Sequence, residues 1–389
     1  MQVQAANSNK YPDVAVIGAG VFGVWIAHQL IDEGKSVVLL DAYGAANSRA
    51  SSGGESRIIR VGYGADEFYS RWAMQSLQRW RDFATSVDPT LFHRTGVLWM
   101  SSKGDPHGLH SLRTLEKLGI SFEILSKNVL QDRYSQINFS DIETGILEND
   151  SGVVAARRAV QSLFRTAIQK GLDYRADVVL PPASEGDLSE IRTTSGKTLS
   201  AGVFVFACGS WMPKVFPALL RDRIISTRQE VYFFGTPPGD PRFSVSTMPA
   251  WIDFGNETYG VPDLENRGFK IAFDRHGPQF DPDLSERIVT ADLLAETRQH
   301  LAHRFPALKN APLLEGRVCQ YENTSNGDFL IDRHPEFRNV WLVCGGSGHG
   351  FKHGPMVGEY VASRINDDGP VEPRFTLATK AKSRQRTVF

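Results

Sequence analysis

Short apolar runs and one amphipathic stretch organise the start of the chain. Residues 13–18 and 36–41 are apolar runs with the length of buried strands, and residues 21–33 between them place apolar side chains at helical spacing. Gly34 is a suitable residue to end that helix. The order strand, helix, strand predicts a βαβ unit at the start of the chain.

Both patterns recur further along the chain. Apolar residues at helical spacing predict helices over residues 69–83, 155–170, 291–305 and 355–365. Apolar runs predict strands over residues 95–101, 121–125, 174–179, 203–209 and 340–344, and turn residues predict a hairpin over 181–198. Thr290 is the expected N-cap of the helix over residues 291–305. Residues 229–273 alternate and are rich in aromatics, which predicts an antiparallel sheet in a second lobe.

The order of these segments predicts two lobes, which a chain of 389 residues is long enough to form. The fold class is α/β, with a Rossmann-like nucleotide-binding domain and an inserted α+β second lobe built on an antiparallel or mixed sheet. We expect the nucleotide-binding domain to be discontinuous, comprising residues 1–90, 151–225 and 326–389. Residues 91–150 and 226–325 form the predicted substrate domain.

Composition narrows the class of protein. Apolar residues make up 41% of the chain and charged residues 22%, and the net charge of −1 gives no electrostatic case for nucleic acid. Three cysteines without zinc-site spacing favour a reducing, cytoplasmic compartment and no metal. The apolar stretch 14–27 is too short and too interrupted by glycine to cross a membrane.

A glycine fingerprint lies between the first strand and the first helix. It reads Gly18-Ala19-Gly20-Val21-Phe22-Gly23, in which the glycines allow a tight turn, close approach of a pyrophosphate and close helix–strand packing. Asp41 follows about twenty residues later, at the end of the next strand, where a carboxylate binds ribose hydroxyls. The motif predicts a dinucleotide site, but it does not separate FAD from NAD.

A second unusual segment covers residues 51–60, where Arg57 and Arg60 flank two isoleucines. In an extended segment the two arginines face opposite sides, and in a helix they share a face. One interpretation is a surface segment with solvated arginines. The other is that one arginine contacts the cofactor while the second clamps a substrate carboxylate.

With these motifs the sequence resembles the monomeric sarcosine oxidase family, which includes N-methyl-amino-acid oxidases and lies within the D-amino-acid-oxidase-like flavoproteins. The resemblance extends from Gly18 to the helix after Pro355. The segments that carry it, besides the fingerprint, are residues 56–60, 208–211, 268–270, 318–321, 329–335 and 347–352.

The resemblance implies a covalent FAD, bound through an 8α-thioether to Cys319. A small buried thiol with a packing role is the other interpretation of this cysteine. The implied cofactor-binding residues are Gly18, Gly20, Val21, Phe22, Gly23, Asp41, Ser52, Ser56, Arg57, Cys319, Gly348, His349, Gly350, Phe351 and Lys352. We interpret His349, which stands between glycines, as a flavin contact or a backbone-shaping residue rather than a catalytic base.

The resemblance also implies catalytic roles. Arg60 and Lys352 would hold the substrate carboxylate, while Tyr259 and Tyr321 would line the substrate pocket. Lys270 would lie beside the flavin with Arg57 and promote the reaction with oxygen through a fixed positive charge. From the pattern alone, Lys270 also suits an exposed sheet edge, and Lys352 suits a solvated flank of a helix.

Two positions depart from the family pattern. Sarcosine oxidases commonly have histidine where this chain has Gly53, and another where it has Asp274. We expect the first change to open space near the flavin and the second to place a carboxylate in or near the substrate pocket. Asp274 therefore suggests a substrate with an additional polar or cationic group.

The predicted activity is oxidation of a secondary amine, such as an N-alkyl amino acid, to an imine, with O2 reduced to hydrogen peroxide. Glycated amino acids, cyclic imino acids and N-methyl aromatic amino acids are all candidate substrates. One alternative is a flavin amine dehydrogenase with another electron acceptor. The other is an NAD-linked binding or regulatory module in which Cys319 is structural. The partners are a small amine and O2, with no nucleic acid or membrane, and we expect a monomer.

Overall fold

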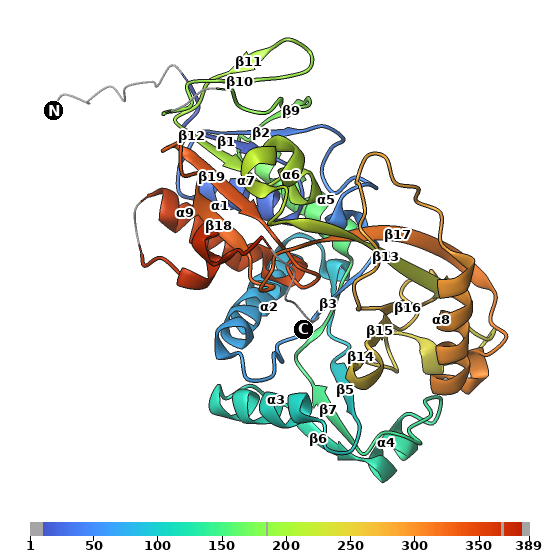
Figure 1. Ribbon diagram of the computed structural model, residues 1–389. Helices are drawn as coiled ribbons and strands as arrows, with labels where there is room; N and C mark the ends of the chain where they lie inside the picture. Colours follow the sequence, from blue (N-terminus) through green and yellow to red (C-terminus); the bar gives the residue numbers. More distant parts are fainter. Residues whose placement is uncertain (1–10, 184–185, 367–368, 383–389) are drawn as a thin grey trace.

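A computed structural model describes residues 11–183, 186–366 and 369–382, and its two main sheets lie in different lobes (Figure 1). The first sheet has six strands in the order β18-β19-β12-β1-β2-β9. Their bounds are β1 Val14–Ile17, β2 Val37–Asp41, β9 Asp173–Ala176, β12 Val203–Phe206, β18 Leu330–Arg333 and β19 Val340–Cys344. All neighbours are parallel except β18 and β19.

Alternation along β1 explains why its sequence is continuously apolar. Val14 and Val16 pack into one core cluster with helix α1 (Val21–Asp32), while Ala15 and Ile17 pack into another on the opposite face of the sheet. A strand buried on both faces needs apolar residues at every position. Helices α5 (Ala156–Gln169) and α9 (Gly354–Ile365) pack against α1. The predicted βαβ unit and α/β class are thus confirmed.

The second lobe contains an eight-stranded sheet in the order β17-β13-β16-β15-β14-β5-β7-β6. The bounds are β5 Val97–Ser101, β6 Glu123–Ser126, β7 Thr144–Glu148, β13 Ile225–Phe234, β14 Ala250–Asp253, β15 Thr258–Val261, β16 Phe269–Phe273 and β17 Leu313–Asn323. Helix α8 (Ala291–Arg304) lies beside β15 and β16 in Figure 1. The long pair β13 and β17 extends from this lobe toward the first sheet.

Smaller elements complete the described chain. Strands β3 Arg57–Ile59, β4 Phe92–His93 and β8 Gly152–Val154 form a three-stranded sheet, and β10 Ile191–Arg192 pairs with β11 Thr198–Leu199. The remaining α-helices are α2 Glu67–Val87, α3 Pro106–Lys117, α4 Lys127–Arg133, α6 Met212–Val215 and α7 Pro217–Leu220. In the described residues, none of the helices combines the length and apolarity needed to cross a membrane.

Several predicted boundaries shift for identifiable reasons. Helix α2 begins at Glu67, earlier than predicted, because the carboxylate of Asp66 caps it by accepting the Tyr69 N–H at 3.2 Å. Thr290 is the N-cap of α8, but its side chain makes no capping bond. Its backbone N–H donates to Glu230 Oε2 at 2.9 Å instead. The division into two domains by residue range stays a prediction.

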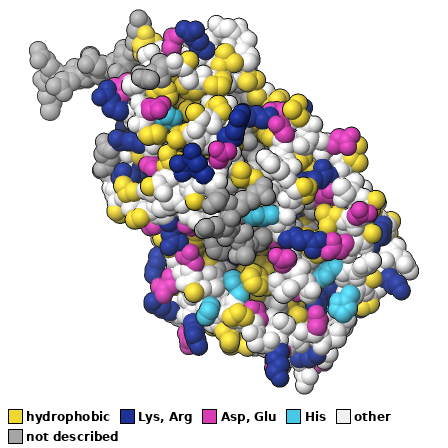
Figure 2. Space-filling view, viewed as in Figure 1, with side chains coloured by type: hydrophobic (Ala, Val, Ile, Leu, Met, Phe, Trp, Pro, Cys, Tyr) yellow, Lys and Arg dark blue, Asp and Glu magenta, His cyan; other side chains and the backbone are white. Residues whose placement is uncertain are grey.

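The visible surface mixes charges of both signs. Figure 2 shows lysine, arginine, aspartate and glutamate side chains interspersed over this face, without a broad field of one sign. This distribution agrees with the net charge of −1.

Candidate active site

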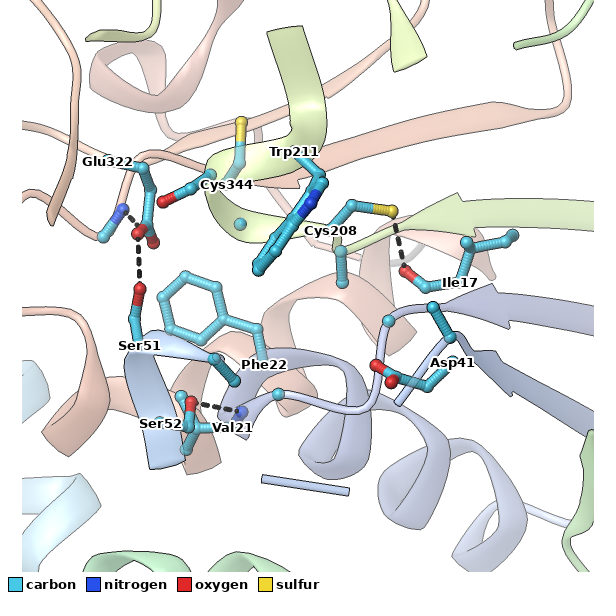
Figure 3. A pocket seen from close by; sticks show the side chains of 18 of the residues that line it. Ile17, Val21, Phe22, Asp41, Ser51, Ser52, Cys208, Trp211, Glu322 and Cys344 are labelled. Atoms are coloured by element: carbon cyan, nitrogen blue, oxygen red, sulfur yellow. Dashed lines mark hydrogen bonds between the residues drawn. The ribbon is translucent and has the colours of Figure 1, made fainter. Parts of the chain in front are cut away.

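Two cavities meet at one wall of the protein interior. The larger, of about 510 Å³, is lined by Ile17 and Asp41 at the ends of strands of the first sheet and by Glu322 on β17 (Figure 3). Cys319, also on β17, lines the same cavity. The second, of about 390 Å³, lies on the side of the second lobe. Both are lined by Arg57, Cys319, Tyr321 and Gly348, so a molecule that fills the first cavity would form part of the wall of the second.

The fingerprint glycines shape the start of the larger cavity. Gly18 has φ of +107°, and a Cβ there would lie 2.4 Å from the carbonyl oxygen of Ala207. A Cβ on Gly23 would lie 1.8 Å from the carbonyl oxygen of Gly18. A larger residue at Gly23 would push α1 away from the turn after β1, and one at Gly18 would push that turn away from the end of β12, so both glycines keep the N-terminus of α1 at the cavity. That terminus is where a pyrophosphate binds.

Ser52 and Asp41 supply polar groups at the same end. The Val21 N–H donates to Ser52 Oγ at 2.9 Å, which leaves the serine hydroxyl hydrogen for another acceptor. Asp41 Oδ2 accepts the Ala19 N–H at 2.8 Å, and Oδ1 accepts the Tyr43 and Gly44 N–H groups at 2.7 and 2.8 Å. Burial raises the pKa of Asp41 despite these bonds. The fixed carboxylate suits ribose hydroxyls.

Cys319 occupies the far end of the larger cavity. Its Sγ lies 3.8 Å from Arg57 Nη2, and the side chain is half-buried. Burial raises the pKa values of the other two cysteines, Cys208 and Cys344, which disfavours their reactive thiolate forms. Cys319 is therefore the cysteine best suited to nucleophilic attack.

These observations fit an extended dinucleotide whose reactive ring lies near Cys319. Most of the predicted cofactor residues line the larger cavity: Gly18, Gly20, Val21, Phe22, Asp41, Ser52, Arg57, Cys319, Gly348, Gly350 and Phe351. Gly23 does not line the cavity, but it allows α1 to pack closely on the turn at Gly18. His349 and Lys352 line the second cavity instead. Ser56 lines neither, because it is buried and its carbonyl accepts bonds from Arg57 and Lys270.

One end of the second cavity is cationic. Arg60 and Lys352 both line it and both are buried. Lys352 Nζ donates to the hydroxyl of Tyr63 at 2.8 Å and to the carbonyl of His349 at 3.0 Å. Burial, followed by the neighbouring Arg60, lowers the pKa of Lys352 well below its usual value. A bound carboxylate would offset this cost by pairing with both cations.

Arg57 and Arg60 reach this region from an extended segment. Strand β3 ends at Ile59, and Arg60 lies just beyond it. Of the two alternatives, the extended one holds for residues 57–59, but the chain leaves the strand before Arg60, and both arginine side chains line the second cavity. The guanidinium of Arg60 lies 4.4 Å from the ring centre of Tyr63 and 4.9 Å from that of Trp99.

Tyr63 is a connecting residue that the sequence did not indicate. Its hydroxyl lies 3.1 Å from His349 Nδ1 and 2.8 Å from His353 Nε2, besides its bond with Lys352. Burial lowers the pKa of His353 well below the usual range, so that ring is neutral. Tyr63 thereby holds the cationic end in place. No local motif marks it, since its partners follow almost three hundred residues later.

The other walls of the second cavity are aromatic and acidic. Tyr259, Tyr321, Trp99 and Phe254 line it, and the Tyr321 hydroxyl donates to Asp274 Oδ1 at 2.8 Å. Burial and the nearby Asp274 raise the pKa of Tyr321, which stays protonated. Asp274 lines this cavity and adds a carboxylate to its wall, so its position in the substrate pocket stays a prediction that depends on the role of the cavity.

Lys270 is buried on β16, between β13 and β15, so the exposed-edge interpretation is wrong. Its Nζ donates to the carbonyl of Ser56 at 3.0 Å and lies 5.6 Å from the ring centre of Tyr259. It lines a separate cavity of about 90 Å³ rather than either large one. Burial, followed by Arg57, lowers its pKa to about 7, so its positive charge is not fixed at neutral pH.

The expectation that Gly53 opens space at the cofactor is wrong. Gly53 lines neither large cavity. A Cβ at this position would lie 2.0 Å from the carbonyl oxygen of Asn47, so the glycine permits close packing of two backbone segments. In this chain, contact with the backbone of Asn47 therefore favours glycine at position 53, where sarcosine oxidases commonly have histidine.

Known proteins resemble this chain along most of its length. The family model for the FAD dependent oxidoreductases called DAO matches residues 13–364. The peroxisomal sarcosine oxidase of Mus musculus is 31% identical over 374 residues, 91% of this chain and 92% of that protein. The monomeric sarcosine oxidase of Bacillus sp. is 29% identical over 361 residues, covering 90% and 92%. N-methyl-L-tryptophan oxidase of Salmonella agona is 27% identical over 362 residues, covering 91% and 94%.

Solved structures share the fold. L-Proline dehydrogenase from P. horikoshii gives a TM-score of 0.83 at 20% identity, covering 94% of this chain and 97% of that one. Fructosyl amine:oxygen oxidoreductase from Aspergillus fumigatus gives 0.78 at 19% identity, covering 96% and 90%.

Proposed function

The chain belongs to the DAO family of FAD-dependent oxidoreductases, and we propose that it oxidises a secondary amine that carries a carboxylate. The observation that carries this proposal is the shared wall of the two cavities. Cys319 and Arg57 line both, so a flavin in the first cavity would meet a substrate held by Arg60 and Lys352 in the second. The family match sets aside the NAD-linked alternative.

When bound, FAD supplies the acceptor for a hydride equivalent from the amine carbon and later releases its electrons. The residues that would hold it are the fingerprint glycines, Asp41, Ser52 and Arg57. Cys319 is the proposed covalent anchor. In support of this role, its thiol is half-buried, lies beside a guanidinium and occupies the end of the cavity opposite the fingerprint.

Substrate orientation is the main task of the second cavity. Arg60 and Lys352 would bind the carboxylate. The Tyr63 hydroxyl accepts a hydrogen bond from Lys352 Nζ and so holds this ammonium group in position. Holding the reacting carbon in one orientation removes much of the entropy cost of reaction. Tyr259, Tyr321 and Trp99 would exclude water from the amine, which favours its neutral, oxidisable form.

Lys270 is the proposed group for the reaction with O2. Its ammonium would stabilise negative charge that develops on oxygen, with the carbonyl of Ser56 fixing its position. Because Lys270 lies outside both large cavities, we retain a second candidate function, an amine dehydrogenase that passes its electrons to an acceptor other than O2. Peroxide formed in a one-to-one ratio with oxidised amine under air distinguishes the oxidase from the dehydrogenase.

The test is a panel of amines assayed for peroxide. It contains N-methyl amino acids with small, aromatic and cationic side chains, cyclic imino acids and glycated amino acids, each with a decarboxylated analogue. We expect activity with carboxylate-bearing secondary amines and a large loss with the analogues. Equal activity on both sets would contradict the proposed carboxylate site.

A further inference from the structure

Glu322 is a buried carboxyl in the wall of the larger cavity that no motif indicated. It follows Tyr321 on β17, and 9% of its surface is exposed. In Figure 3 its side chain lies between Ser51, Cys344 and the ring of Phe22, on the same cavity as the fingerprint residues. A carboxyl enclosed in this way is costly to charge unless hydrogen bonds support it.

Two hydrogen bonds tie this carboxyl to different parts of the cavity. The Ser51 hydroxyl lies 3.1 Å from the Gln320 carbonyl and 3.2 Å from Glu322 Oε2 and shares its one hydrogen between these acceptors, while Oε1 accepts the Gly346 N–H at 3.2 Å. A Cβ on Gly346 would lie 2.8 Å from Oε1, so the backbone can approach the carboxyl only as glycine. Both donors remain available whether the carboxyl is charged or neutral, because each oxygen has more than one acceptor site.

The described neighbours of Glu322 supply little positive charge. Its own strand contributes Cys319 and Tyr321, and β19 contributes the buried thiol of Cys344. Arg57, from the segment that carries Ser51, donates to the carbonyls of Ser51 and Ser56.

Among the described residues on the other elements, none adds a cation that affects the pKa of Glu322. Helix α1 presents Val21 and Phe22 to the cavity. The loop after β19 carries His349, whose ring lies within hydrogen-bond distance of Tyr63 and the Gly327 carbonyl. Burial raises the pKa of Glu322 to about 7, so both protonation states are accessible near neutral pH.

We propose that Glu322 takes up a proton from solvent when the bound flavin is reduced. This inference rests on the proposed flavin site. The reductant supplies two electrons, and the flavin takes both with one proton to become the reduced anion. The new negative charge in the larger cavity favours uptake of a second proton, which forms an O–H bond on the Glu322 carboxylate. Reduction near neutral pH would then consume more than one proton for each flavin.

The test measures the flavin midpoint potential against pH in the purified holoenzyme, titrated anaerobically with dithionite. The slope reports protons taken up for each pair of electrons. We expect the wild-type slope around neutral pH to approach twice that of Glu322→Gln, and the variant potential to exceed the wild-type potential above pH 7. Equal slopes in both proteins would overturn the proposal.

Two further proteins separate this effect from general disturbance. Glu322→Asp keeps an ionisable group and is expected to retain a steeper slope than Glu322→Gln. Glu230→Gln alters another buried carboxyl, which bonds Tyr232 and Arg228 and lies outside both large cavities, so its slope should equal the wild-type slope. A wild-type slope in Glu322→Gln, or a loss of slope in Glu230→Gln, would contradict the assignment.

A direct proton count does not depend on any variant folding. Wild-type protein is reduced in weakly buffered solution with a pH indicator, and uptake above one proton for each flavin is expected near pH 7. Uptake of one proton or fewer would exclude the proposal while leaving the flavin function intact. A protein that binds no flavin would instead refute the proposed function itself.

Discussion

Tyr321 donates a hydrogen bond from its hydroxyl to Asp274 Oδ1 at 2.8 Å, which fixes a carboxylate in the wall of the second cavity. Arg60 and Lys352 line the same cavity, and Asp274 is close enough to Lys352 to raise its pKa, so the wall carries basic and acidic groups together. A substrate with one carboxylate and a second, cationic group would match both kinds of group. This relationship gives the hypothesis about Asp274 a geometric basis.

Asp274→Asn is therefore expected to reduce the preference for cationic over neutral N-methyl amino acids by about ten- to a hundredfold, since a charge-assisted hydrogen bond contributes about 1.5–3 kcal/mol. The measurement is kcat/KM for a matched pair of substrates. The neutral substrate serves as the control and should change little. An unchanged ratio would remove Asp274 from substrate selection.

Arg60→Met tests the carboxylate clamp. Losing one charge-assisted partner should lower kcat/KM on carboxylate substrates by roughly 10²-fold, corresponding to about 2.7 kcal/mol. The flavin should stay bound, because Arg60 lines only the second cavity. Arg192→Met, at an exposed position on β10, is the matched control and should leave activity unchanged. Full activity of Arg60→Met would disprove the clamp.

The lowered pKa of Lys270 predicts that the rate of the reaction with oxygen depends on pH. Its pKa is lowered to about 7, so the ammonium is present below that pH and is lost as pH rises through it. The rate of flavin reoxidation by O2 should fall over this interval. Lys270→Met should be slower on the order of 10²-fold and lose this pH dependence.

Stopped-flow mixing of reduced enzyme with oxygenated buffer measures this rate. Anaerobic reduction by substrate is the control, and it should be nearly unaffected because Lys270 lies outside the substrate cavity. A reoxidation rate in Lys270→Met that matches wild type would transfer the oxygen role to another group.

Cys319→Ser tests the covalent bond. A serine hydroxyl is a much weaker nucleophile than a thiolate, so the variant should bind FAD without forming the bond. After acid precipitation, the yellow colour should remain with wild-type protein and pass into the supernatant with Cys319→Ser. Cys208→Ser is the control and should keep its flavin in the pellet. Release of flavin from wild-type protein would show that the cofactor is not covalent.

Local rules explain which parts of the site the sequence could predict. Gly18, Gly20 and Asp41 follow from the backbone geometry of one strand–turn–helix unit, where each residue acts on a near neighbour. Lys270 was ambiguous because its exposure depends on whether β16 is an edge strand. Sheet order is set by pairings between segments far apart in the chain, and no local pattern records it.

The missed residues share one property, which is dependence on distant partners. Glu322 contacts Ser51, 271 positions earlier in the chain, and Tyr63 contacts His353, 290 positions later. Neither lies in a motif whose spacing implies its role. At Gly53 the sequence suggested a feature that the fold does not have. The absence of a side chain suggested open space, but the backbone of Asn47 fills that space.

Anaerobic mixing of the purified protein with an N-methyl amino acid tests whether a carboxylate-bearing secondary amine reduces the flavin. We predict that the flavin absorbance bleaches with the amino acid but not with its decarboxylated analogue. We also expect that admitting air restores the absorbance, with one peroxide formed for each flavin. A colourless protein, or a flavin that no carboxylate-bearing secondary amine reduces, would contradict the proposed function.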